Sequence, residues 1–119
     1  MSAKIMSNSN GIVTVKITGK LTYPELVTLQ KSIMGIIGPQ GCICILITLE
    51  NFQGWSKESD WDDMSFMSIN DPYINKMAIV GKRKWERLVL MFTAQEIREF
   101  PIKYCQPNDL RTANAWLAE

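Results

Sequence analysis

The chain contains no histidine. Without an imidazole, one copy cannot build a Ser-His-Asp or Cys-His nucleophile system, an imidazole general base or a His-ligated zinc site. Three cysteines make a poor zinc site, and we expect them to be small buried side chains in a reducing compartment. The net charge is also small, because 13 Lys and Arg are balanced by 12 Asp and Glu. The chain as a whole therefore has no strong electrostatic field that would attract nucleic acid or anionic lipid. The sequence therefore predicts no metal, no cofactor, no catalytic residue and no nucleic-acid partner.

Long apolar runs are missing as well. The first ten residues lack the apolar stretch of about 7–15 residues that a secretory signal needs, which predicts a cytoplasmic protein. The 18 residues from Ser32 to Leu49 carry no charge, but glycines and Pro39 interrupt them. We expect a helix end, a turn and a buried strand there, and no transmembrane segment. The length of 119 residues is enough for one core, and we treat residues 1–119 as a single domain.

The first half of the chain carries the patterns of a hairpin, a helix and a buried strand. Two segments with apolar residues flank the turn-forming residues 8–11, which predicts an N-terminal hairpin. Thr22 and Glu25 form a capping box, and apolar residues at helical spacing continue to Gly38-Pro39, where we expect the helix to end. The apolar run 42–49 predicts a central strand that is covered by helices on both faces.

The middle of the chain alternates between helix and strand patterns. Ser56 can cap a helix that continues to about Ile69. Residues 76–80 predict a short strand, and a helix that includes Leu88 on its core face begins at residues 82–84.

The last third repeats this alternation. Thr93 and Glu96 offer another capping box, and residues 102–106 predict the last strand. Asn108 is expected to cap a final helix that buries Leu110. Since strands separated by helices run parallel, the chain is predicted to be an α/β protein with a mixed, mostly parallel five-stranded sheet, an N-terminal hairpin and about four helices.

Loops at the carboxyl ends of the parallel strands are the place where such sheets bind ligands. Here these loops are predicted at residues 50–55, 81–83 and 106–108. Trp55 lies in a loop rather than at helical core spacing, so it is a candidate contact for a partner chain or an apolar ligand. The alternative is that Trp55 covers an apolar edge and that the cations are merely solvated. The candidate ligand- or partner-binding residues are Glu50, Asn51, Phe52, Trp55, Lys82 and Arg83.

Several segments together resemble a known family. They are residues 51–55 (Asn-Phe-Gln-Gly-Trp), Trp61-Asp62-Asp63, residues 77–81 with Trp85, and the ending from Ala113 to Leu117. They look like small bacterial proteins with the SpoIIAA-like fold, which is similar to STAS domains and more distantly to the CRAL-TRIO lipid-binding fold. The resemblance spans about residues 11–117 and implies an α/β layer structure that is often a homodimer, with no established activity.

STAS antagonists of anti-sigma factors carry a phosphorylated serine in an Asp-Ser-Ser/Thr-Gly motif after the central strand. This sequence departs from that pattern, because residues 50–56 read Glu-Asn-Phe-Gln-Gly-Trp-Ser. Ser56 or Ser59 could occupy a comparable position as the phosphoacceptor. We therefore expect a non-enzymatic, STAS-like binding or regulatory module that binds a protein partner or a small apolar or anionic ligand. The alternatives are a phosphorylation-controlled switch and the binding of a lipid acyl chain.

Overall fold

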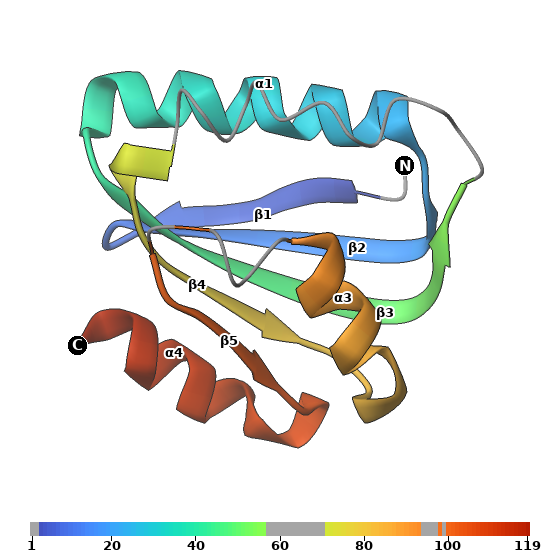
Figure 1. Cartoon of the computed structure of the whole chain (residues 1–119). Coiled ribbons are helices and arrows are strands. Elements are labelled where there is room, and N and C mark those ends of the chain that lie inside the picture. The colour runs from blue at the N-terminus through green and yellow to red at the C-terminus, as the bar shows by residue number, and fades with distance from the viewer. Residues whose placement is uncertain (1–2, 57–70, 94–97, 99) are drawn as a thin grey trace.

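One five-stranded sheet organises the molecule (Figure 1). The computed structural model describes residues 3–56, 71–93, 98 and 100–119. The strands lie in the spatial order β1-β2-β3-β4-β5, with β1 antiparallel to β2 and every later pair parallel. This confirms the predicted fold class and the position of β3 at the centre. The strands are β1 (Ala3–Ser9), β2 (Ile12–Leu21), β3 (Ile43–Trp55), β4 (Ile74–Val80) and β5 (Ile102–Cys105).

The N-terminal hairpin forms where its turn sequence predicted it. Asn10 and Gly11 both have positive φ, at 56° and 76°, which is the geometry of a two-residue turn whose twist matches the flanking strands. The pairing of β1 with β2 shifts register between Ile5 and Ser7. Such an irregularity on an edge strand discourages pairing with another sheet.

Helix α1 (Tyr23–Gln40) begins at the predicted capping box. The Glu25 backbone N–H donates to the Thr22 hydroxyl at 3.4 Å, and that hydroxyl donates to the Glu25 carboxylate at 2.7 Å. The predicted end at Gly38-Pro39 is wrong, because the helix continues through Pro39 to Gln40. Gly41 ends it with a φ of 80°, and its N–H donates to the Ile37 carbonyl at 2.7 Å.

The later helices are short and follow β4 and β5. A single 3-10 turn (Arg83–Trp85) leads into α3 (Glu86–Phe92), as predicted, but Leu88 is exposed rather than in the core. Helix α4 (Leu110–Ala118) follows a second 3-10 turn (Pro107–Asp109). The predicted cap at Asn108 is wrong, since Asp109 takes the N-cap position without a side-chain hydrogen bond, and Leu110 is exposed. Leu88 lies about 100° around α3 from the buried Val89, so it faces away from the sheet, and Leu110 is the first residue of α4, at the open end of that helix.

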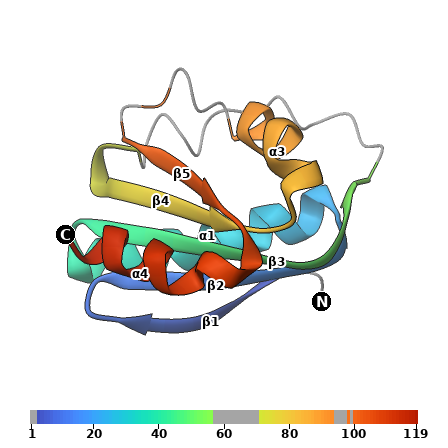
Figure 2. The same ribbon diagram turned by 90° about the horizontal axis from the view of Figure 1, so that it is seen from below.

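Two apolar clusters lie on opposite faces of the sheet. The larger one packs α1 and Val89 of α3 against alternate residues of all five strands. The smaller one packs Ala113 and Leu117 of α4 against Leu46 and its neighbours on β4 and β5. Figure 2 shows α4 in front of the strands and α1 behind them. Because both faces are covered, β3 is apolar on both sides, as its sequence predicted.

The predicted helix at residues 56–69 lies almost wholly outside the described residues, and so does Glu96 of the second capping box. Thr93 itself follows α3, and its hydroxyl donates back to the Val89 and Leu90 carbonyls at 3.0 and 3.2 Å. None of the helices in the described part of the chain is long and apolar enough to cross a membrane.

Candidate functional site

The segment 50–55, predicted as a loop, is instead a continuation of β3. Its pairing with β2 runs on past Thr18↔Glu50 to Leu21↔Trp55, with register shifts on the way. Asn51 and Gly54 have positive φ, at 50° and 94°, and these two residue types adopt that conformation most readily. Asn51 and Gly54 therefore supply bends within a long strand.

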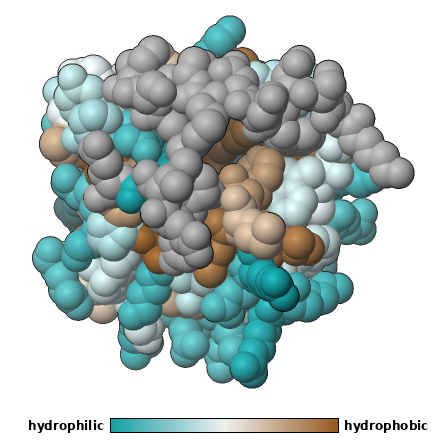
Figure 3. All heavy atoms as spheres, viewed as in Figure 1, coloured by the Kyte–Doolittle hydropathy of each residue, from teal (hydrophilic) through white to brown (hydrophobic). Residues whose placement is uncertain are grey.

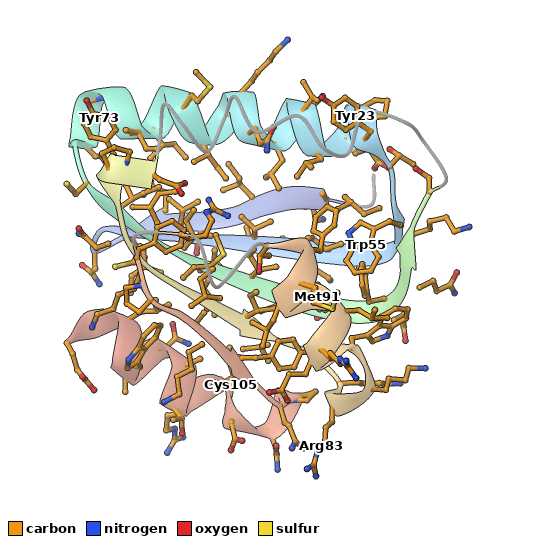
Figure 4. All side chains as sticks on the ribbon, in the orientation of Figure 1. Tyr23, Trp55, Tyr73, Arg83, Met91 and Cys105 are labelled. Atoms are coloured by element: carbon orange, nitrogen blue, oxygen red, sulfur yellow. The ribbon has the colours of Figure 1, made fainter. Side chains whose placement is uncertain are left out.

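The predicted charged residues do not converge. Glu50 forms an ion pair with Lys16, with 2.9 Å between Nζ and Oε2. Lys16 lies between Val15 and Ile17 on β2, so the ion pair is on the face of the sheet opposite to their side chains. Lys82 and Arg83 are exposed, and Asn51 is exposed as well. In Figure 4, Arg83 points outward at the bottom of the molecule, away from Trp55.

Phe52 and Trp55 meet aromatic residues from α3 and the turn before it. Phe52 is buried, and its ring centroid lies 5.3 Å from that of Trp55 and 4.8 Å from that of Trp85. Phe92 stacks on Trp55 at 4.7 Å. We call these four residues the aromatic cluster. Trp55 is thus half-buried rather than an isolated exposed side chain, which agrees better with the alternative that it covers an apolar edge.

The Trp85 indole N–H is buried and has no hydrogen-bond partner among the described residues. Gly54 brings the β3 backbone close to this ring, since a Cβ on Gly54 would lie 3.4 Å from the Trp85 six-membered ring. That distance is an ordinary contact, and it is the φ of 94° that favours glycine at this bend.

Beside the aromatic cluster lies a cavity of about 160 Å³ between α1, α3 and the sheet, which we call the α1–α3 cavity. The structure describes 18 residues that line it, of which fifteen are apolar and three, Gln30, Thr93 and Arg98, are polar. Of the six predicted binding residues, only Phe52 and Trp55 line it. The apolar lining residues are Val15, Ile17, Leu21, Leu26, Leu29, Ile33, Ile45, Ile47, Leu49, Phe52, Trp55, Met77, Ile79, Val89 and Phe92.

Among the described residues of this lining, Arg98 is the charged one, and Asp71 neutralises it. Its guanidinium donates to both Asp71 carboxylate oxygens at 2.8 and 2.6 Å, and to the Thr93 carbonyl at 3.1 Å. The two side chains are only 7% and 11% exposed, and the guanidinium also lies over the Phe100 ring at 4.7 Å. Nothing in the sequence pattern singled out this pair, because its members are 27 residues apart and neither belongs to a recognisable motif.

A second polar contact lies where β4 ends. The Tyr104 hydroxyl donates to the Lys82 carbonyl at 2.7 Å, and partial burial together with the charge of Glu86 raises the pKa of Tyr104 to about 12. Burial also raises the pKa of the Cys105 thiol on the same strand. Both groups are therefore held in their protonated forms at neutral pH.

The cysteines and the predicted phosphoacceptors are placed as follows. All three cysteines are free, and Cys105 is buried as predicted, but Cys42 is exposed because β3 begins only at Ile43. Ser56 is half-buried, and its N–H donates to the Leu21 carbonyl at 2.9 Å. Ser59 lies outside the described residues.

Comparison with known proteins places the chain in a family. No curated protein matches it. Among solved structures, it is similar to an uncharacterized protein of the DUF3478 family with a SpoIIAA-like fold from Shewanella loihica PV-4. The TM-score is 0.73 at 20% identity, and the match covers 97% of this chain and 91% of the other. The family model described as SpoIIAA-like matches residues 12–118. The chain therefore belongs to the SpoIIAA-like family.

Proposed function

We propose that this protein is a non-enzymatic binding module that holds a small, uncharged apolar molecule in the α1–α3 cavity. The observation that carries the proposal is the composition of the lining, in which fifteen of the 18 described residues are apolar. Such a lining gains free energy from burying hydrocarbon. The charged groups of the candidate site support binding rather than chemistry, because Arg98 is used by Asp71 and Glu50 by Lys16.

The volume sets the size of the ligand. A cavity of roughly 150 Å³ lined by Leu, Ile and Phe is large enough for benzene. The α1–α3 cavity, at about 160 Å³, suits a molecule of that size or the end of one acyl chain, and it is too small for a whole phospholipid.

The Arg98–Asp71 pair sets the charge of the ligand. Because the pair is already neutral and almost fully buried, a ligand carboxylate would bring an unpaired charge close to Asp71. A guanidinium has five N–H donors, and the structure pairs three of them, so a neutral carbonyl or hydroxyl oxygen is the better partner. We expect 1-hexanol to bind at least about tenfold more tightly than hexanoate.

The test uses the full chain in two-dimensional NMR, with toluene, 1-hexanol and hexanoate as probes. Toluene and hexanol should shift the methyl signals of Ile33, Ile45 and Ile79, which line the cavity. Val89→Phe, which fills the cavity from α3, should abolish these shifts. Leu88→Phe is the matched control, because it introduces the same side chain at the neighbouring, exposed position of the same helix.

Absence of methyl shifts at millimolar toluene in the wild-type protein would contradict the proposal. Native mass spectrometry of freshly purified protein gives an independent check, since a mass excess that disappears on denaturation would report a retained ligand. We place this function in the cytoplasm, an inference that the three free cysteines support.

A further inference from the structure

The outer side of α3 and the turn before it combine exposed apolar and cationic side chains. Met91 is 68% exposed and Leu88 is 49% exposed, the two highest values among the large hydrophobic residues of this segment. Met91 lies four residues after Arg87 and three after Leu88, so it contacts both positions and the three share one side of the helix. We call these three residues together with Lys82, Arg83 and Lys84, which are all exposed, the α3 face.

Charge on this face is strongly one-sided. Residues 82–87 contain four cations and one carboxylate, Glu86, which is half-buried, while the whole chain has a net charge of only +1. None of the four cations forms an ion pair within the described part of the chain. Figure 3 shows hydrophobic residues gathered over α3 with hydrophilic residues directly below them.

We propose that the α3 face docks on the surface of a lipid bilayer that contains anionic phospholipids. Its cations would contact the phosphate groups, and Leu88 and Met91 would enter the boundary between head groups and acyl chains. A bilayer fits this surface better than a helix-binding protein does, because an apolar partner helix docks in a groove and here the apolar side chains project outward from a helix (Figure 4).

The position of α3 gives the docking a consequence. The same helix that exposes Leu88 and Met91 lines the α1–α3 cavity with Val89 and Phe92. Docking would therefore place one wall of the cavity next to the acyl chains of the bilayer, where apolar molecules dissolve. The docking itself does not depend on an occupied cavity, so it can be tested separately from the proposed function.

The experiment is vesicle flotation of the full chain, with vesicles of phosphatidylcholine alone or with about 30% phosphatidylglycerol. We expect binding to the anionic vesicles, little binding to the neutral ones, and release in about 0.5 M salt. Arg87→Gln should weaken binding about fivefold, which is the contribution of one cation near an anionic surface. Met91→Ser should also weaken it, by removing the most exposed apolar group.

Matched controls separate this face from general surface effects. Arg111→Gln removes an exposed cation from α4, and Met34→Ser removes an exposed methionine from α1, so both should leave vesicle binding unchanged. Failure to bind anionic vesicles would overturn the proposal, and so would equal losses in the controls. A dimer in sedimentation equilibrium that Met91→Ser dissociates would also overturn it, because a second copy would then cover the face.

Discussion

Gly81 lies where β4 ends, and the surrounding side chains leave no space for a Cβ. A methyl group there would lie 2.6 Å from the Tyr104 hydroxyl and 2.8 Å from a Leu49 methyl. We expect Gly81→Ala to lower the free energy of unfolding by about 1–3 kcal/mol, as overpacking does. Urea denaturation followed by circular dichroism measures it.

Two further variants identify the cause. Tyr104→Phe removes the nearest clashing atom, so in the Gly81→Ala background it should restore part of the lost stability, although alone it loses the hydrogen bond to Lys82. Gly35→Ala meets no atom within 4 Å and should stabilise α1 by about 0.5–1 kcal/mol. If Gly81→Ala were as harmless as Gly35→Ala, the packing at the end of β4 would have to be looser than described.

Tyr104 also couples stability to alkaline pH. Its pKa is about 12 in the folded chain against an ordinary value of 10.0, so the folded state holds this proton more tightly than the unfolded state does. The contribution of Tyr104 to the free energy of unfolding is fully present below pH 10 and is lost as the pH rises toward 12, because the unfolded chain binds fewer protons than the folded chain in that range. Urea midpoints measured from pH 8 to 11 should fall less steeply in Tyr104→Phe. Some slope should remain, since burial raises the pKa of Cys105 as well.

At the scale of elements, local sequence patterns were enough to predict a helix start or a turn where interactions between near neighbours determine the structure. The Thr22–Glu25 capping box and the N-terminal hairpin were predicted correctly because each depends on neighbours within a few residues. Segment 50–55 was predicted wrongly because its pairing with β2 is a long-range contact that outweighs the local preference of Asn51 and Gly54 for a turn. The site was found only in part for the same reason, since the α1–α3 cavity is formed by side chains from five elements.

The Arg98–Asp71 pair joins two segments that are 27 residues apart in the sequence. It ties the 3-10 turn before β4 (Asp71–Tyr73) to the segment before β5. Asp71→Asn leaves a buried guanidinium without its counter-charge, so we expect it to lower the free energy of unfolding by about 3–5 kcal/mol. Glu50→Gln makes the same chemical change in the exposed pair with Lys16 and should cost under about 1 kcal/mol. Equal costs in urea denaturation would mean that burial does not distinguish the two pairs.

At the scale of the whole molecule, the two faces of the sheet are filled differently. The α4 face closes on small side chains, among them Ala78 and Ala113, both fully buried. The other face carries larger side chains and, in the part of the chain that the structure describes, the helices α1 and α3, with the α1–α3 cavity between them and the sheet. A void of this kind costs stability, because lining atoms lose contacts that a filled core would give them. A core that keeps such a void has stability to gain from a ligand.

Val13 and Val15 of β2 allow a test of whether the unfilled cavity costs stability. Both are on β2, both are fully buried and both face the same side of the sheet, but only Val15 lines the cavity. Val15→Ile places a methylene in the void and should raise the free energy of unfolding by about 0.8 kcal/mol, whereas Val13→Ile has no void to fill and should lower it by about 1 kcal/mol or more. Urea denaturation with and without toluene measures both effects. Toluene should stabilise the wild type and Val13→Ile alike, and Val15→Ile less, because in that variant the methylene already occupies part of the space that the ligand needs.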